Sequence, residues 1–239
     1  MKVMKFGGTS VGSPDRMKNV ASLITESGDP TFVVLSAMSG TTNSLIEISN
    51  YLYKKNPDGA NEVINKLEKK YMQHVEELYS TDEYKEKTRE FLREEFKYMR
   101  SFTKDIFTSF EEKSIVAQGE IMSTNMVLNY LQEQGIKATL LSAFDFMRTD
   151  KNAEPDAQYI KEKLTAIMTE NEGYQIYITQ GFICLNAYGE IDNLQRGGSD
   201  FTASLIGVAL GAEEIQIWTD IDGMHNNDPR IVDETEAIR

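Results

Sequence analysis

The sequence predicts an α/β protein in which helices cover both faces of a mostly parallel sheet. Short aliphatic or β-branched runs bounded by Gly, Ser or Asp alternate with amphipathic helical patterns, as they do in parallel α/β proteins. The expected strands are residues 2–6, 31–36, 138–142, 175–179 and 215–219. Because such sheets bind ligands at the carboxyl ends of their strands, a site is expected in the segments that follow them.

The turn after the first strand has the composition of an anion-binding site. Lys5 stands near the end of the strand, and Gly7, Gly8 and Gly12 follow it. Backbone N–H groups that no Cβ obstructs can reach phosphate oxygens, and the lysine adds a full positive charge. The spacing fits neither the dinucleotide fingerprint G-x-G-x-x-G nor the P-loop, in which the lysine follows the glycines. The motif alone predicts either another kind of phosphate-binding turn or a plain strand-to-helix turn.

The segment after this turn carries the signals of a helix start. Ser13 offers a capping hydroxyl, Pro14 suits the first turn, and Asp15 faces the positive end of the helix dipole. One apolar face follows at helical spacing, made of Met17, Val20, Ala21 and Ile24. Similar faces predict helices around residues 45–52, 160–167 and 201–208.

Residues 54–113 differ in composition from the rest of the chain. They are dense in Lys and Glu, lack strand signals and repeat aromatic residues at loosely helical intervals. We expect a helical insertion that covers one end of the domain, with solvated charges and packed aromatic rings. A dimer arm or a lid is the alternative interpretation.

Composition and charge narrow the classes of function. The 239 residues include 25 basic and 38 acidic side chains, a formal net charge of −13, so no nucleic-acid partner is expected. Cys184 is the only cysteine, which excludes an internal disulfide and favours a buried structural residue over a catalytic thiol. The chain begins in a strand, without a leader segment, and holds no apolar stretch long enough for a bilayer. These features predict a cytoplasmic protein without a membrane partner.

Polar residues gather in three segments next to expected helix starts. Residues 36–43 are rich in hydroxyls, which fits either a capped helix or a ligand loop. Glu120 precedes an apolar helix, as either a first-turn carboxylate favoured by the dipole or the partner of a ligand's ammonium group. In the third segment, Arg-Gly-Gly-Ser-Asp with a capping serine, Arg196 can pair with a carboxylate and Asp200 can orient Lys5. A surface arginine beside a helix cap is the plain alternative there.

The aspartate-rich loop after the last expected strand fits a nucleotide better than a metal. Residues 219–230 resemble part of a calcium loop but lack the spacing and the terminal glutamate of an EF-hand. His74, expected at the surface, and His225 show neither metal-site spacing nor a Ser–His–Asp arrangement. No metal site and no general base are therefore predicted.

The lack of a general base is compatible with one reaction in particular. Phosphoryl transfer to a carboxylate needs no base, because a carboxyl group with a pKa of about 3.9 is ionised near neutrality. Such a transfer depends on alignment and on neutralising charge at the phosphoryl group. A lysine, glycine N–H groups and Mg²⁺ can supply that neutralisation.

Seven motifs together resemble the aspartokinases, of the amino-acid kinase family. In chain order they are KFGGTSVG, VVLSAMSGTTN, QGEIMS, MRTDKNAEPD, ITQGF, RGGSDFTA and IWTDIDG with DPR, and they extend over essentially the whole chain. The resemblance implies a three-layer α/β/α sandwich. It also implies transfer of the γ-phosphoryl group of ATP, bound with Mg²⁺, to the β-carboxylate of L-aspartate, which is the entry step to lysine, threonine and methionine. At full length it implies a homo-oligomer.

The same resemblance implies roles for individual residues. Lys5, aided by Gly7 and Gly8, would neutralise the phosphoryl group in flight, and Asp200 would organise that lysine. Glu120 would hold the α-ammonium group of aspartate. The whole aspartate site would comprise Ser36, Thr42, Glu120, Phe182, Ser199 and Arg196, the last on the α-carboxylate. The nucleotide would be lined by Lys5, Gly8, Thr219, Asp220, His225 and Arg230.

The sequence also departs from the family pattern. Gln195 stands where a glycine is usual, and His225 replaces a usual tyrosine. The chain stops at Arg239, before the further lysine, the closing elements and the ACT regulatory domains that the family carries. Residues 1–239 are therefore expected to be a catalytic domain incomplete at its C-terminus, without an ACT domain.

Two alternative functions remain open from the sequence. One is a kinase of glutamate or acetylglutamate, and the other is a nucleotide- or amino-acid-binding module without catalysis. Glu120 together with Arg196 suits a free α-amino acid, because an N-acylated one would leave Glu120 without its ammonium partner.

Overall fold

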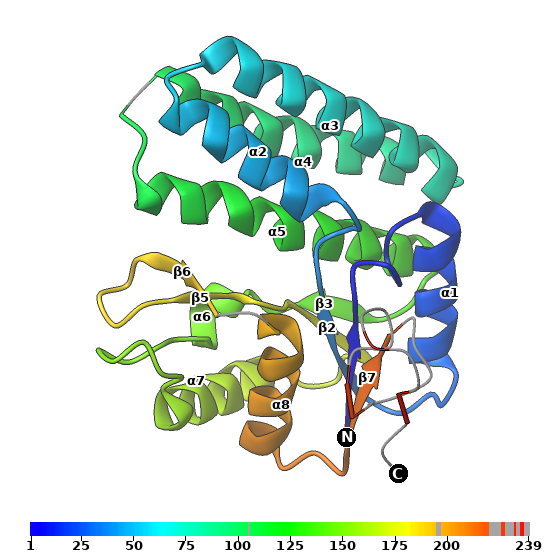
Figure 1. Ribbon diagram of the computed structural model, residues 1–239. Coiled ribbons are helices and arrows are strands. Elements are labelled where there is room, and N and C mark those ends of the chain that lie inside the picture. The colour runs from blue at the N-terminus through cyan, green and yellow to red at the C-terminus, as the bar shows by residue number, and fades with distance from the viewer. Residues whose placement is uncertain (105, 195–196, 220–225, 228–231, 233–234, 237–239) are drawn as a thin grey trace.

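A parallel five-stranded sheet forms the centre of the molecule (Figure 1). The computed structural model describes residues 1–104, 106–194, 197–219, 226–227, 232 and 235–236. The strand order is β3-β4-β2-β1-β7, and every neighbouring pair is parallel. The strands are β1 (Lys2–Phe6), β2 (Thr31–Leu35), β3 (Ala138–Leu140), β4 (Ile176–Gln180) and β7 (Glu214–Trp218). The predicted α/β class and its mostly parallel sheet are confirmed.

Helices cover both faces of this sheet. They are α1 (Pro14–Thr25), α2 (Thr41–Tyr53), α3 (Pro57–Leu78), α4 (Asp82–Ser101), α5 (Ser109–Glu133), α6 (Ala143–Phe146), α7 (Ala157–Glu170) and α8 (Gly198–Leu210), with a 3₁₀ turn η1 (Phe102–Lys104). Met4 and Phe6 of β1 belong to the core that α1–α5 build, whereas Val3 belongs to the core under α6–α8. The alternation of side chains along a strand therefore directs Lys5, two residues after Val3, to the α8 face.

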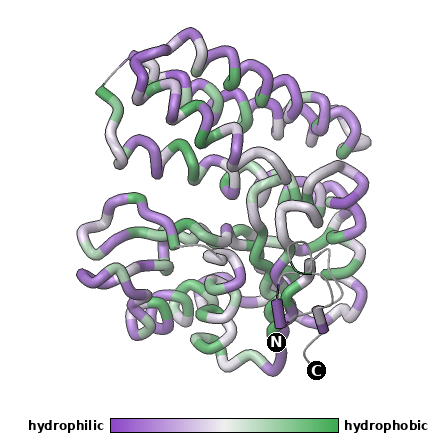
Figure 2. The backbone as a smooth tube through the Cα atoms, in the orientation of Figure 1, coloured by the Kyte–Doolittle hydropathy of each residue, from purple (hydrophilic) through white to green (hydrophobic). Residues whose placement is uncertain are grey.

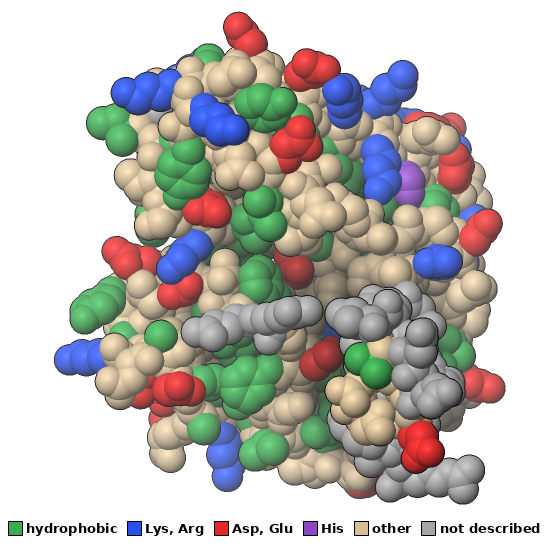
Figure 3. Space-filling model, in the orientation of Figure 1, with side chains coloured by type: hydrophobic (Ala, Val, Ile, Leu, Met, Phe, Trp, Pro, Cys, Tyr) green, Lys and Arg blue, Asp and Glu red, His purple; other side chains and the backbone are tan. Residues whose placement is uncertain are grey.

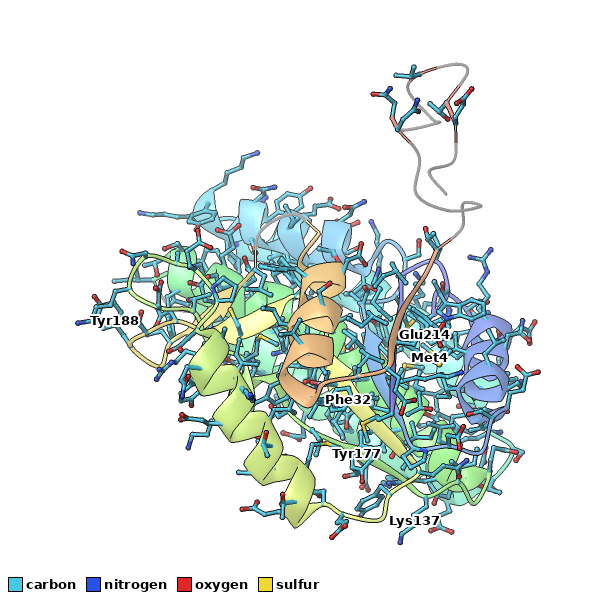
Figure 4. The ribbon with its side chains drawn as sticks, turned by 90° about the horizontal axis from the view of Figure 1, so that it is seen from below. Met4, Phe32, Lys137, Tyr177, Tyr188 and Glu214 are labelled. Carbon is cyan, nitrogen blue, oxygen red and sulfur yellow. The ribbon has the colours of Figure 1, made fainter. Side chains whose placement is uncertain are left out.

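The inner strands read as nearly continuous apolar runs because both of their faces are covered. All five residues of β2 and all five of β4 are buried. Phe32 and Tyr177, labelled in Figure 4, are partners in the β2–β4 register and stack at 6.3 Å between ring centroids. In Figure 2 the strands at the centre are largely green, whereas α3 and α4 carry long purple stretches.

Helix α1 begins where the sequence predicts. The Ser13 side chain accepts a hydrogen bond from the Arg16 N–H at 3.4 Å, and Pro14 is the first helical residue. The predicted apolar face, made of Met17, Val20, Ala21 and Ile24, is buried. This cap orients the helix start toward the glycine-rich turn after β1.

The charged segment from residue 57 to residue 104 folds as α3, α4 and η1 and packs on α2 and α5 (Figure 1). Tyr71 of α3 and Phe96 of α4 meet edge-on at 5.8 Å between centroids, and both rings are fully buried. Ion pairs such as Lys85–Glu76 at 3.7 Å link the two helices at the surface. His74, expected at the surface, is half-buried, and its Nδ1 lies 2.8 Å from the Lys70 carbonyl oxygen on the same helix.

A short antiparallel hairpin between β4 and α8 was not predicted. It consists of β5 (Ile183–Leu185) and β6 (Ile191–Asn193), each only three residues long. Cys184 is buried in β5, as expected for a structural cysteine. Among the described helices, none is long and apolar enough to cross a membrane.

Candidate active site

A cleft opens at the carboxyl ends of β1, β2 and β4. It has a volume of about 410 Å³ and is open to solvent. Figure 3 shows this face of the molecule, hollowed between the α2–α5 layer and α8. The lining residues come from the glycine-rich turn, the loop after β2, the middle of α5 and the start of α8: Lys5, Gly8, Ser36, Ala37, Met38, Ser39, Gly40, Thr42, Asn43, Glu120, Phe182, Gly197, Gly198, Ser199 and Asp200. The cleft lies where parallel α/β sheets bind their ligands.

An ion pair joins the first strand to the start of α8. Lys5 Nζ lies 2.7 Å from Asp200 Oδ1, and the lysine side chain is only 11% exposed. Asp200 belongs to the first turn of α8, whose N-cap is Gly197 with φ +82°. The predicted capping serine is not the cap, because Ser199 lies inside the first turn. The ammonium group thus lies in the cleft beside a helix N-terminus whose cap residue makes no side-chain hydrogen bond among the described residues, an arrangement suited to phosphate.

Gly8 allows the turn after β1 to contact the loop after β2. A Cβ at Gly8 would lie 2.7 Å from the Ala37 carbonyl oxygen, closer than side chains approach backbone. The Ser39 N–H donates to the Gly8 carbonyl oxygen at 3.0 Å. Close contact, not an unusual backbone angle, therefore requires glycine at this position.

Glu120 lies in the middle of α5, which corrects the interpretation of this residue as a first-turn carboxylate. It is 4% exposed, and its Oε1 accepts a hydrogen bond from the Ala37 N–H at 3.1 Å. The buried Oε2 has no hydrogen-bond partner among the described residues. Burial raises the pKa of the Glu120 carboxyl from 4.5 to about 7, although the Ala37 N–H opposes this rise. A buried carboxylate with a free oxygen in a cleft suits a ligand that brings a positive charge.

Ser36, Ser199 and Phe182 also line the cleft. The Ser36 hydroxyl donates to Ser199 Oγ at 3.0 Å, so the end of β2 is linked to the start of α8. Phe182 has φ +69°, in the left-handed region that side chains other than glycine seldom adopt. The Thr202 Oγ1 accepts a hydrogen bond from its N–H at 3.0 Å and holds this conformation. Such strain is typical of ligand-binding sites.

The structure brings most of the predicted site residues together. Lys5, Gly8, Ser36, Thr42, Glu120, Phe182, Ser199 and Asp200 all line the cleft. Gly7 lies beside it, since a Cβ there would be 3.5 Å from Lys5 Nζ. Ser39, Gly40 and Asn43 also line the cleft and were not predicted as individual ligand contacts, although all three lie within the hydroxyl-rich segment 36–43.

The predicted nucleotide residues are only partly described. Thr219 lies at a separate cavity of about 230 Å³ beside Phe6 and Trp218, whose rings stack at 5.7 Å. Arg196, Asp220, His225 and Arg230, together with Gln195, lie outside the described residues. Within the described ranges, no group of three or more His, Cys, Asp or Glu side chains could hold a metal ion.

The fold is an α/β protein with helices on both faces of a parallel sheet and a ligand cleft at the ends of its strands, and comparison with known proteins gives its family. The amino acid kinase family matches residues 1–239, so the chain belongs to that family. It is 32% identical over 241 residues to lysine-sensitive aspartokinase 3 of Escherichia coli, covering 99% of this chain and 52% of the relative. It is 34% identical over 244 residues to chloroplastic aspartokinase 1 of Arabidopsis thaliana, covering 96% of this chain and 42% of the relative.

A solved structure agrees with these relatives. The crystal structure of E. coli aspartokinase III in complex with aspartate and ADP matches this chain with a TM-score of 0.85 and 32% identity. The match covers 100% of this chain and 53% of the crystallised one. The chain thus spans about half the length of the proteins it matches.

Proposed function

We propose that the chain carries the catalytic site of an aspartate kinase. The reaction would transfer the γ-phosphoryl group of ATP to the β-carboxylate of L-aspartate and give 4-phospho-L-aspartate and ADP. The observation that carries the proposal is one cleft lined both by the Lys5–Asp200 ion pair and by buried Glu120, one of whose carboxylate oxygens has no partner among the described residues. The similarity to aspartokinases supports the choice of acceptor.

The phosphoryl transfer needs charge neutralisation rather than a base. A β-carboxylate oxygen of aspartate attacks the γ-phosphorus, and the bond from that phosphorus to the β,γ-bridging oxygen breaks to release ADP. Lys5 would neutralise the equatorial oxygens of the transferred group, with Gly7 and Gly8 N–H groups beside it. Asp200, 2.7 Å from Lys5 Nζ, would hold the ammonium group in line. Mg²⁺ would arrive with ATP as part of the substrate.

Recognition of the acceptor would depend on its α-carbon substituents. Glu120 Oε2 would pair with the α-ammonium group, which gives this oxygen the partner that the described residues do not supply. Arg196 is the expected partner of the α-carboxylate. Ser36, Thr42, Ser199 and Phe182 would complete the pocket. The same pairing argues against an N-acylated substrate, because an amide cannot neutralise Glu120.

The nucleotide would lie toward β7. Thr219 follows this strand directly, and we assign Asp220, His225 and Arg230 to the same ligand from their motif. The cytoplasmic location and the homo-oligomeric state of the full-length protein stay predictions from the sequence.

A substrate panel tests the proposed function. ADP release by the full-length protein is measured with L-aspartate, L-glutamate and N-acetyl-L-glutamate as acceptors, and binding of aspartate and an ATP analogue is measured by calorimetry. We expect turnover with aspartate to exceed turnover with N-acetyl-L-glutamate by at least about a hundredfold, because acylation leaves buried Glu120 unpaired. Turnover with L-glutamate, which keeps the ammonium group, should be lower by about 10- to 200-fold, the discrimination that one extra methylene allows. A preference for another acceptor, or binding without turnover, contradicts the proposal and supports one of the two alternatives.

A further inference from the structure

The loop that lines one wall of the cleft leads into helix α2, which has no side-chain cap. Residues 36–43, here called the acceptor loop, run from the end of β2 into the first turn of α2, and all of them except Thr41 line the cleft. Helix α2 begins after Gly40, whose φ is +81°, and no side chain caps it. The Thr41 N–H donates to the Met38 carbonyl oxygen at 2.9 Å, which closes one turn within the loop, and contacts from other elements hold this turn against its neighbours.

Thr41 points away from the cleft and contacts helix α3. It is fully buried, and its Oγ1 lies 3.1 Å from the phenolic oxygen of Tyr71, which is also fully buried. The Tyr71 ring is itself fixed edge-on against Phe96 of α4. Burial raises the pKa of Tyr71, and the nearby Glu120 carboxylate raises it further, so the phenol keeps its proton. A phenylalanine would fill the same space, which leaves the hydroxyl group to serve the contact with Thr41.

A second contact comes from the preceding residue of the same helix. Lys70 Nζ donates to the Ser39 carbonyl oxygen at 3.1 Å. Helix α3 therefore holds the loop on both sides of Gly40. From the opposite side, Gly119 of α5 lies so close that a Cβ there would be 2.7 Å from Ala37 Cβ. The acceptor loop is thus held between α3 and α5.

We propose that Tyr71 and Lys70 are positioning residues that fix the acceptor loop and thereby set the affinity for the acceptor substrate. The proposal rests on the proposed function and gives α3 a part in it. Neither residue lines the cleft. Any shift of the loop would displace the Thr42 side chain and the Ala37 N–H, which holds Glu120.

The first test removes one hydroxyl group. In the full-length protein, Tyr71→Phe should raise the aspartate KM about three- to tenfold, the effect of losing one neutral hydrogen bond. The ATP KM should stay within about twofold, because the acceptor loop carries none of the residues assigned to the nucleotide. Thr41→Val removes the same contact and should act alike. The double variant should be no worse than the stronger single one, as expected for residues that act through one interaction.

Matched controls separate positioning from general stability. Tyr79 is also buried at the end of α3, and its hydroxyl donates to the Met126 carbonyl oxygen at 2.7 Å, far along α5 from Glu120. Tyr79→Phe should lower the melting temperature about as much as Tyr71→Phe and leave the aspartate KM unchanged. Lys70→Met should raise this KM, whereas Lys66→Met, one turn earlier on α3 and paired with Glu62, should not.

Amide hydrogen exchange measures how firmly the acceptor loop is held, in the absence of any substrate. The amides of Ser39 and Thr41 should exchange faster in Tyr71→Phe than in the wild type, and their exchange rates should be unchanged in Tyr79→Phe. An unaltered aspartate KM in Tyr71→Phe beside an active wild type overturns the positioning role and leaves the proposed activity intact. If aspartate proves not to be the acceptor, the exchange measurement still tests the positioning role. Equal exchange of these amides in the wild type, Tyr71→Phe and Tyr79→Phe would overturn that role, so its failure can be told apart from failure of the proposed activity.

Discussion

At the scale of single residues, the burial of Glu120 is the feature that the stability of the fold explains least. A buried carboxylate destabilises a fold unless a partner neutralises it, and one oxygen of Glu120 has none among the described residues. Its neighbour on α5, Gly119, permits the close approach of Ala37, whose N–H donates to the Glu120 carboxylate. Glu120 is better explained as a group that awaits a cationic ligand than as a structural carboxylate.

This explanation predicts opposite effects of Glu120→Gln on stability and on binding. The pKa in the folded protein, about 7, lies above the ordinary value of 4.5. The wild type therefore loses stability as the pH rises through 7, and the neutral variant does not. At pH 8 we expect Glu120→Gln to unfold with a free energy higher by up to about 3 kcal/mol, with no gain at pH 4. The aspartate KM should rise about 10- to 100-fold.

Denaturant titrations at pH 4 and pH 8, with aspartate kinetics, check this prediction. Glu112→Gln on the same helix serves as the control, because Glu112 accepts from Tyr53 and does not line the cleft. Equal stability of Glu120→Gln and wild type at pH 8, or an unchanged aspartate KM, would contradict the role of Glu120.

At the residue level, the sequence predicted the pairing of Lys5 with Asp200 correctly but misplaced Glu120, because the start of its helix was misjudged. The proximity of Lys5 and Asp200 was predicted and is present. Glu120 was placed in a first turn because its helix was taken to begin at the apolar run. The true start carries a capping box, in which Thr108 and Glu111 bond reciprocally, and its T-x-x-E spacing is visible in the sequence.

At the scale of elements, the site depends on two loops that contact each other through their backbones. The turn after β1 and the acceptor loop meet at Gly8, and α3 and α5 hold the acceptor loop from either side. The strands that carry these loops were predictable, because β2 is buried throughout and β1 buries Val3, Met4 and Phe6. The β5–β6 hairpin was not, because three-residue strands leave no periodic pattern to detect.

Substitution of the two adjacent glycines should therefore have unequal effects. Gly8→Ala places a Cβ 2.7 Å from the Ala37 carbonyl oxygen, and separating the loops should cost about 1–3 kcal/mol of unfolding free energy. Gly7→Ala meets Lys5 Nζ only at an ordinary 3.5 Å and should change this free energy by less than about 0.5 kcal/mol. Thermal and denaturant unfolding of both variants measure the difference. Equal destabilisation would contradict the close contact at Gly8.

At the scale of the whole molecule, the strand order assembles the site from distant parts of the sequence. Placing β1 between β2 and β7, with β4 beyond β2, brings the ends of four strands to one edge. Periodicity predicted the strands and the sheet type but not their order, because order is decided by packing between segments far apart in the chain. The match in fold and sequence to aspartokinases agrees with the assembled site.

The central claim is that this edge transfers a phosphoryl group with Lys5 as its positive charge. Hydroxylamine trapping of the acyl phosphate, with ATP and aspartate, measures the reaction directly in the wild type, Lys5→Met and Lys2→Met. Lys2 lies on the same strand and pairs with Glu214 at 3.5 Å outside the cleft, so it controls for the loss of a lysine from β1. We predict aspartyl hydroxamate from the wild type and Lys2→Met, and a fall of at least about a hundredfold in Lys5→Met with its fold intact. Near-normal hydroxamate formation by Lys5→Met would contradict the account.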